Sequence, residues 1–266
     1  MLKNKNALLW SLSKEDHRVG YLFGSMHLPN LLSSQQMGQL HYRIDECTLF
    51  LNEIDISKEM ESPINLELII NSTPSNKLIS SKLLVKVQRY FSKTVGTDVS
   101  PYFQLPPFLL HMELSKLLYD KGKESDNMLD VSLFNYAHKK GIQTGGLEDT
   151  IEHYKTLEKI NRTDQVRQLR GLLKNLSKSR SKIKRLAQMY SDQKSLQIYK
   201  SSLKQMGKLK RPFLYERNQI MSQSIVEHIN ESKIVFATAG VAHLHGNKGI
   251  LKSLKKEGLN IKGIYL

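Results

Sequence analysis

The stretch of sequence that decides the fold is VGYLFGSMH, at residues 19–27. Its first five residues form a short apolar run, which predicts a buried strand, and Gly24 opens a turn that ends at His27. After Ser33, apolar residues recur every three or four positions and predict a helix, which leads to a second apolar run at 48–51. We therefore expect a strand–helix–strand unit whose two strands are parallel neighbours and end at the same edge of a sheet.

The same arrangement returns near the C-terminus. The apolar run at 234–237 predicts another buried strand, and the glycine-led turn after it ends at His243. A helix is expected at 249–256, a last strand at 261–266 and one more short strand at 142–144. Together these segments predict an α/β fold with a central mixed, mostly parallel sheet flanked by helices.

Two segments interrupt this pattern. Residues 56–140 are helical and irregular, with five prolines, and 127–140 has the spacing of one good helix. Residues 155–211 carry apolar positions at helical spacing. Because the sequence has no internal repeat and no low-complexity linker, we expect a single domain over 1–266 with these two segments as helical insertions.

The net charge of +15 is concentrated in the second of these segments. Residues 155–211 hold 17 Lys and Arg but only 3 Asp and Glu. Such a basic field can attract nucleic acid, anionic lipid or an acidic protein. Aromatic residues are sparse there, so it lacks the stacking surfaces of single-strand binders. We expect a solvated basic helical face, with an anionic partner as the alternative, and we do not expect nucleic acid as a partner.

The rest of the composition is that of an ordinary globular protein. The one cysteine, Cys47, cannot form an internal disulfide and lies in an apolar run, which favours a buried, inert thiol. No apolar stretch approaches the roughly 18 residues of a membrane span. The run at 7–10 is too short for the core of a signal peptide. We expect a cytoplasmic protein with no transmembrane segment, or an exported one if a signal peptide has been removed.

Four residues share one structural position. His27, Glu53, Glu148 and His243 each follow a predicted strand, at the edge where open α/β sheets bind ligands. Two imidazoles and two carboxylates suit a divalent ion such as Mn, Co, Zn or Fe. Each residue alone has an ordinary alternative, because a lone histidine is more often a surface residue and a carboxylate after a strand often caps the next helix. The argument for a site is that Gly-x-x-His occurs twice, each time directly after a buried strand.

Two further polar residues have open interpretations. His245 could present a second imidazole beside His243 on an extended segment, but we favour a solvent-facing histidine before the turn at Gly246. Asn218 falls on the apolar face of a helix expected after Pro212. A polar side chain on such a face needs a partner, either in the site or in the core.

Matching segments run through about nine tenths of the chain, in the order and spacing of a known family. They are Leu9-Trp10, Tyr21–His27, Leu51–Ile54, Leu129-Asp130, Ala137, Gly146–Asp149, Tyr215–Met221 and Ala239–Leu251. On these residues the chain resembles the TraB/PrgY/GumN family, which includes the TIKI-type metalloproteases. It departs from the usual pattern at Ser25-Met26, where Thr-Ile is common, and at Val241-Ala242, where small residues including glycine are common.

The resemblance implies a metal-dependent hydrolase, with the peptidase activity of TIKI-type members, on a fold related to the erythromycin-esterase and ChaN-like (EreA/ChaN-like) proteins. It implies that His27 and His243 are the signature histidines, that Glu53 and Glu148 are the acidic site residues, and that Arg217 is the arginine of a Glu-Arg-Asn motif. Relatives that sequester pheromones or bind haem iron imply an alternative, a non-catalytic protein that binds a ligand, a peptide or haem.

These residues suggest a mechanism for a peptide or small-molecule substrate. We expect His27, His243, Glu148 and Glu53 to surround a divalent ion that activates a water molecule. Glu53 is our expected general base. Arg217 is expected to pair with the developing oxyanion or with a substrate carboxylate, and a salt bridge to a ligand carboxylate is an equal alternative.

Overall fold

The computed structural model describes residues 6–29, 31–57, 73–120, 128–158 and 161–266. The chain forms two compact units, which we call the sheet unit and the helical unit. The sheet unit comprises Met1–Ser62, Asp126–Leu157 and Gln188–Leu266, and the helical unit comprises Pro63–Ser125 and Glu158–Ala187. Both pieces of the helical unit lie inside the expected insertions at 56–140 and 155–211, and the expected single domain stays a prediction.

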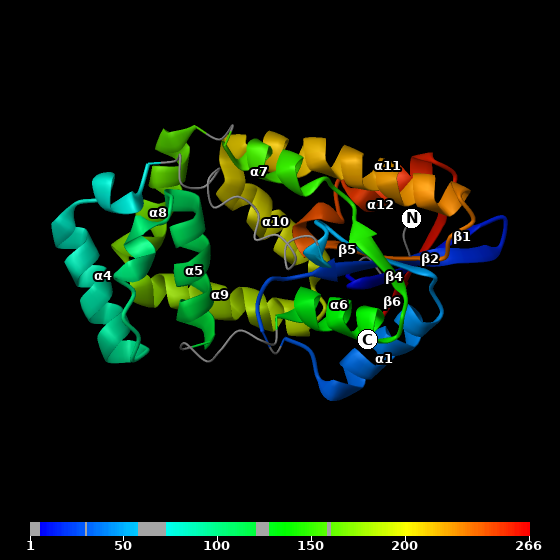
Figure 1. Ribbon diagram of the computed structural model, residues 1–266, viewed down its shortest axis with the longest axis horizontal. Helices are drawn as coiled ribbons and strands as arrows, with labels where there is room; N and C mark the ends of the chain where they lie inside the picture. Colours follow the sequence, from blue (N-terminus) through cyan, green and yellow to red (C-terminus); the bar gives the residue numbers. More distant parts are fainter. Residues whose placement is uncertain (1–5, 30, 58–72, 121–127, 159–160) are drawn as a thin grey trace. The chain divides into compact units, whose positions relative to one another are not determined.

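A mixed sheet forms the centre of the sheet unit (Figure 1). In the described residues it has six strands in the order β4-β3-β5-β2-β1-β6. They are β1 (Leu9–Lys14), β2 (His17–Ser25), β3 (Leu49–Asn52), β4 (Gln143–Gly146), β5 (Val235–Gly240) and β6 (Asn260–Ile264). The pairs β4–β3, β3–β5 and β5–β2 are parallel, and β2–β1 and β1–β6 are antiparallel. The predicted α/β fold with a mixed, mostly parallel sheet is therefore confirmed.

One predicted pairing is wrong. We expected β2 and β3 to be neighbours, but β5 lies between them and pairs in parallel with both. The connection through a helix sets the direction of the second strand but not its distance from the first. The apolar sequence of β5, which is buried over Val235–Ala239, suits a central strand covered on both faces. Because β2 and β3 still run in the same direction, both end at the same edge.

Strand β1 was not predicted. We described its first residues as an apolar run too short for the core of a signal peptide and as a family segment at Leu9-Trp10, but not as a strand, yet β1 pairs with both β2 and β6. The turn between β1 and β2 consists of Glu15 and Asp16, which both have positive φ, at 48° and 64°. This is the two-residue turn that matches the twist of a hairpin. Its usual marker, Asn-Gly or Asp-Gly, is missing, so the sequence gives little indication of the hairpin.

Helices cover both faces of the sheet. Figure 1 shows α11 and α12 on one face and α1 and α6 on the other. The helices of this unit are α1 (Ser34–Asp45), α6 (Leu129–Lys139), α7 (Thr150–Glu158), α10 (Ser195–Met206), α11 (Arg217–Asn230) and α12 (Ile250–Lys256), with the short turns η3 (Gly207–Leu209), η4 (Arg211–Glu216, π-helical) and η5 (Val241–His243). Helix α1 begins at a capping box formed by Ser33 and Gln36, where the sequence predicted its start. Cys47 follows it as a buried thiol whose pKa burial raises to about 12, in agreement with an inert cysteine.

The helical unit has a core of its own. Its elements are η1 (Ser75–Lys77), α4 (Ser81–Thr94), η2 (Pro101–Gln104), α5 (Pro107–Asp120), α8 (Arg162–Lys174) and the first three turns of α9 (Leu176–Ser191). Buried leucine, valine and phenylalanine side chains from α4, α5 and α8 form one cluster. Residues 58–72 of the expected insertion lie outside the described residues. Among the helices that are described, none combines the length and the apolar character needed to span a bilayer.

Replacing Gly20 with alanine is expected to lower the free energy of unfolding by about 2–4 kcal/mol. Gly20 has a φ of 153° in β2, and an added Cβ would lie 2.2 Å from the carbonyl oxygen of Val235 in the neighbouring strand. This oxygen belongs to the backbone of the central strand, so it cannot move away without breaking the ladder. Urea unfolding, followed as a change in midpoint at constant slope, measures the loss.

The matched control is Gly38→Ala. Gly38 lies within α1, and an added Cβ there meets no atom within 4 Å. This change should stabilise the protein by about 0.5–1 kcal/mol, because alanine is the better helix former. Similar unfolding midpoints for the two variants would contradict the close approach of β2 and β5.

Candidate active site at the carboxyl ends of the strands

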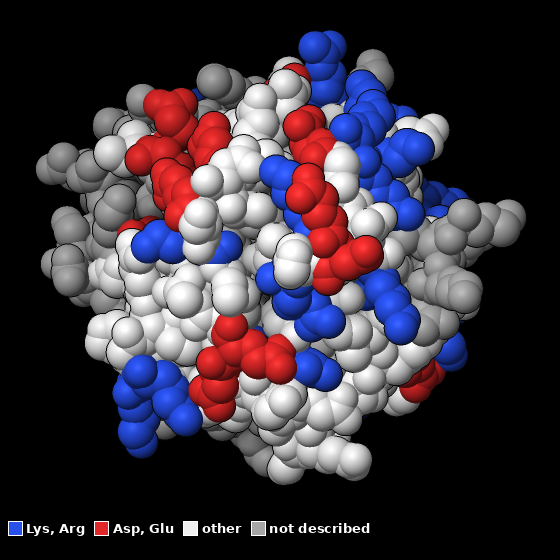
Figure 2. Space-filling view, turned by 90° about the vertical axis from the view of Figure 1, so that its right-hand side faces the viewer, with Lys and Arg blue, Asp and Glu red and all other residues white. Residues whose placement is uncertain are grey.

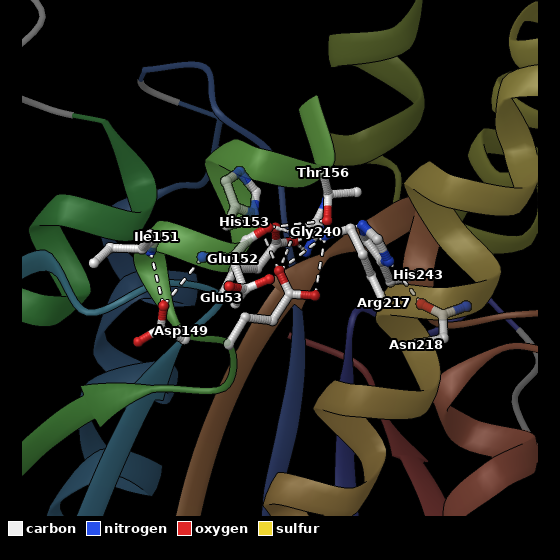
Figure 3. Close-up of polar contacts among 11 residues, drawn as sticks. Glu53, Asp149, Ile151, Glu152, His153, Thr156, Arg217, Asn218, Gly240 and His243 are labelled. Atoms are coloured by element: carbon white, nitrogen blue, oxygen red, sulfur yellow. Dashed lines mark hydrogen bonds and ion pairs between the residues drawn. The ribbon is translucent and has the colours of Figure 1, made fainter. Parts of the chain in front are cut away.

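The polar residues of the site lie where the parallel strands of the sheet unit end. Glu53 directly follows β3, Glu148 lies two residues after β4, and His243 is in the turn η5 after β5. Arg217 and Asn218 come from the first turn of α11, where the helix buries two consecutive polar residues. Figure 3 shows Glu53, Arg217, Asn218 and His243 close together. We call these five residues, Glu53, Glu148, Arg217, Asn218 and His243, the strand-end cluster.

Arg217 joins the two glutamates of the cluster. Its Nε donates to both carboxylate oxygens of Glu148, at 3.0 and 2.9 Å, and its Nη2 donates to Oε2 of Glu53 at 2.7 Å. The side chains of all three residues are at most 13% exposed. The alternative we gave for Arg217, a salt bridge to a carboxylate of the site, is the arrangement present here. Arg217 directly follows the π-helical turn η4, a distortion that often occurs at functional sites.

Glu53 is held as an ionised carboxylate. Its Oε1 accepts a hydrogen bond from the backbone N–H of Gly240, and its Oε2 accepts from Arg217. Burial by itself would raise the pKa of Glu53, but His243 and Arg217, together with His27 and the Gly240 N–H, hold that pKa well below its usual range. A carboxylate that is stabilised this strongly is a weak proton acceptor. The geometry therefore argues against Glu53 as the general base.

His243 has a defined tautomer. Asn218 donates from Nδ2 to the carbonyl of Lys248 at 2.7 Å, so its Oδ1 is the atom that faces Nδ1 of His243, at 2.6 Å. An amide oxygen only accepts, so Nδ1 carries the proton and Nε2 keeps its lone pair. Nε2 lies 3.8 Å from Oε1 of Glu53. Burial lowers the pKa of His243 to about 4, so the imidazole is neutral at physiological pH.

Glu148 is not needed as a helix cap. Asp149 caps α7, because its Oδ1 accepts from the backbone N–H groups of Ile151 and Glu152 at 3.0 and 3.1 Å. Glu148 beside it contacts Arg217 and also Nδ1 of His153, at 3.1 Å. His153 was not among the site residues predicted from the sequence. Its only signal was its position in the first turn of the helix that Glu148 precedes.

His27 lies beside a different carboxylate. Its Nδ1 is 2.7 Å from Oδ2 of Asp130, near the start of α6, and its side chain is 51% exposed. It contributes to the field that keeps Glu53 ionised. The strand ends thus bring Glu53, Glu148 and His243 together with Arg217, and they place His27 in a pair with Asp130.

The fit to a divalent ion can be judged from these contacts. The donor types are suitable, but in the parts of the chain that are described no three His, Cys, Asp or Glu side chains are grouped so that they could hold a metal. Both glutamates instead bind the cationic side chain of Arg217. The arrangement does not fit an ion as it stands, and the metal site stays a prediction.

A comparison with known families agrees with the motifs. The model of the TraB/PrgY/gumN family matches residues 8–263, nearly the whole chain. The chain belongs to the TraB/PrgY/gumN family. No match was found among curated proteins or among solved structures.

The two Gly-x-x-His motifs of this TraB/PrgY/gumN protein pack against each other. We attributed their glycines to a tight backbone turn, but neither Gly24 nor Gly240 has a positive φ. Glycine is needed at both positions because a side chain would have too little space. A Cβ on Gly24 would lie 2.6 Å from the side chain of Leu244, which directly follows the second motif, and 3.3 Å from Cα of Val241 within it; a Cβ on Gly240 would lie 3.0 Å from Oε1 of Glu53. Glycine lets the two loops and the carboxylate approach one another closely.

Two other residues hold the same loops. His245 is buried rather than solvent-facing, so our favoured interpretation of it was wrong. Its Nε2 lies 2.7 Å from Oγ of Ser195, which also donates to the carbonyl of Ala7 at 2.9 Å. Tyr190, one of the positions at helical spacing in the basic segment 155–211, donates its hydroxyl to the carbonyl of Gly24 at 2.6 Å. In this member of the TraB/PrgY/gumN family, Tyr190 of α9 and Ser195 of α10 therefore hold the loops that carry the motif histidines in place.

Proposed function

We propose that the chain is a hydrolase whose reacting centre is the strand-end cluster, and that its substrate contains an amide or ester carbonyl, as in a peptide or a small molecule. The observation that carries the proposal is the neutral imidazole of His243, which is fixed at Nδ1 by Asn218 and keeps the lone pair of Nε2 near the Glu53 carboxylate. Fixing one ring nitrogen so that the other can accept a proton is the arrangement of a histidine general base.

The reaction follows from these positions. Nε2 of His243 takes a proton from water while the water oxygen bonds to the substrate carbonyl carbon. The carboxylate of Glu53, with Oε1 3.8 Å away, stabilises the positive charge that forms on the imidazole. When the bond from the carbonyl carbon to the leaving group breaks, His243 returns the proton to that group. Arg217 acts through Glu53, because it holds the carboxylate ionised and in place.

A divalent ion remains a separate proposal. His243, through Nε2, and Glu53 or Glu148 would hold it, with His27 as a further donor. When bound, the ion would supply a water molecule of lowered pKa. Arg217 would first have to release a carboxylate, and the steps assigned to His243 do not require the ion.

The proposal is tested by replacing His243 with glutamine. Incubation with a peptide library and with small esters, with and without Mn²⁺ or Co²⁺, followed by mass spectrometry, should reveal new termini for the unchanged protein. His243→Gln should lower the rate about 10²–10⁴-fold, because the proton acceptor is lost. His17→Gln, at the exposed start of β2, is the matched control and should leave the rate unchanged.

The other outcomes decide between the alternatives. An undiminished rate in His243→Gln would end the assignment of the base. Tight retention of a peptide or of haem without any turnover would favour the non-catalytic binding protein. Metal analysis tests the divalent ion. About one equivalent of metal in the unchanged protein that is lost in His27→Ala/His243→Ala would support the metal site. Full retention of the metal in that variant would contradict the metal site.

A further inference from the structure

Four basic side chains form a straight row on helix α4 of the helical unit. Lys82, Lys86, Arg89 and Lys93 follow one another at intervals of four, three and four residues, which places them on one face of a helix. All four are exposed. The opposite face of α4 carries the buried residues Leu84, Val87 and Phe91. The row, which we call the α4 row, is therefore the face of the helix that points away from the core, and it extends over about 16 Å.

No acidic side chain among the described residues forms an ion pair with the α4 row. Helix α4, from Ser81 to Thr94, contains no Asp or Glu. The described residues of the helical unit, 73–120, 158 and 161–187, hold 15 Lys and Arg but only 5 Asp and Glu. Two of these five acids pair with Lys116 and Arg167, and no ion pair to a described residue involves the α4 row. Like charges three or four residues apart destabilise a helix, so the α4 row makes an unfavourable contribution to the stability of the fold.

The sheet unit differs in this respect. Figure 2, which views the side of this unit on the right of Figure 1, shows acidic side chains interspersed with basic ones. A surface of mixed sign is the ordinary arrangement for a protein in water. The single sign of the α4 row is therefore a local property and not a result of the net charge spread over the whole chain.

The chemistry beside the row indicates the kind of partner. Val85, next to Lys86, is 56% exposed and is the one large apolar side chain that is exposed among the described residues of the helical unit. No aromatic side chain there is exposed, so nucleic-acid bases have nothing to stack on. Cations attract the acidic headgroups of lipids, and the one apolar side chain beside them can enter the interfacial region of a bilayer.

We propose that the α4 row binds the surface of an anionic lipid bilayer. Four or more Lys and Arg on one face of an amphipathic helix are enough to attract acidic headgroups. A bilayer needs no fitted pocket, because its charges lie in a plane and diffuse to the cations. Helix α4 would lie parallel to the membrane, with the row on the headgroups and Val85 in the interfacial region. The attachment is reversible and weakens as salt screens the charges.

The experiment is co-sedimentation of the full chain with vesicles of phosphatidylcholine, with and without about 30% phosphatidylserine. The unchanged protein should sediment with the anionic vesicles only. Changing all four residues of the α4 row to glutamine should lower the partition coefficient at least about tenfold at low salt. Val85→Ser should give a smaller loss, of about threefold, because one small apolar side chain no longer enters the interface.

The control removes the same charge elsewhere. Lys252, Lys255, Lys256 and Lys262 are exposed in the sheet unit, and changing them to glutamine should leave vesicle binding within about twofold of the unchanged protein. Equal losses in the two fourfold variants would overturn the proposal in favour of net charge. Binding to neutral vesicles of equal strength would overturn it as well, and so would tighter binding to random duplex DNA in the same buffer. Circular dichroism verifies that both variants remain folded.

Discussion

Replacing Arg217 with methionine is expected to lower the free energy of unfolding by about 3–5 kcal/mol. The change keeps an unbranched side chain, although a shorter one, and removes the cation between Glu53 and Glu148. Two buried carboxylates would then lack the cation that they share, and both would lose the hydrogen bonds they accept from Arg217. Urea unfolding at neutral pH measures the effect, with the loss read from the midpoint and extrapolated stability.

Two further variants separate charge from shape. Arg217→Lys keeps the charge but not the planar fork, so it should recover only part of the loss. Combining Arg217→Met with Glu53→Gln and Glu148→Gln removes all three charges and should recover most of the stability, because breaking a buried ion pair costs more than removing it whole. An Arg217→Met protein as stable as the unchanged one would mean that the two carboxylates have access to water.

The same set of variants bears on the proposed function. The neutral triple variant is expected to fold but to hydrolyse nothing, since Glu53 would no longer stabilise a charged His243. Stability and turnover would then respond to different features of one cluster. Stability depends on the balance of charges between Arg217 and the glutamates. Turnover depends on the negative charge that Glu53 presents to His243.

The sequence was sufficient to predict the edge of the sheet at which the site lies. Strands with apolar runs and glycine-led turns are local features, so the segments that carry His27, Glu53, Glu148 and His243 could be assigned to strand ends. The order of the strands was less accessible. The position of β5 between β2 and β3 depends on which strands pair across long distances in the chain, and no local pattern records that.

The contacts within the site could be predicted only in part. Arg217 was placed on a helix near the site, but its bridge to both glutamates depends on the distance from α11 to the ends of β3 and β4. His245 was misjudged because the turn at Gly246 suggested the surface, whereas Ser195 and Trp10 enclose its ring. In each case the decisive contact comes from another element of the fold.

The two buried histidines His243 and His245 lead to a strong dependence of stability on pH. Burial lowers the pKa of both His243 and His245 to about 4 in the folded protein. In the unfolded chain a histidine has a pKa of about 6.5. Between these values the unfolded chain binds protons that the folded protein does not bind. Acid therefore favours unfolding in this window, and each histidine contributes full stability only above about pH 6.5.

The free energy of unfolding should accordingly fall by about 1.4 kcal/mol per pH unit for each histidine as the pH decreases from about 6.5 to about 4. Together the two histidines give a loss of several kcal/mol. Glu53 acts in a different range, because its lowered pKa makes stability fall only below the usual pKa of a glutamate, near 4.5. Urea unfolding at a series of pH values between 5 and 7 measures the slope with little contribution from that carboxylate.

The variant that isolates one histidine is His245→Gln, since His245 lies outside the strand-end cluster and hydrogen-bonds to Ser195. Glutamine can donate to Oγ of Ser195 but does not titrate. The slope of the free energy of unfolding against pH should therefore decrease by the contribution of one proton. His17→Gln, at an exposed position, should leave the slope unchanged. If His245→Gln kept the full slope, His245 would have to bind its proton equally well in the folded and unfolded chain. The burial of its ring against Trp10 would then have no electrostatic consequence, contrary to the physical basis of the lowered pKa.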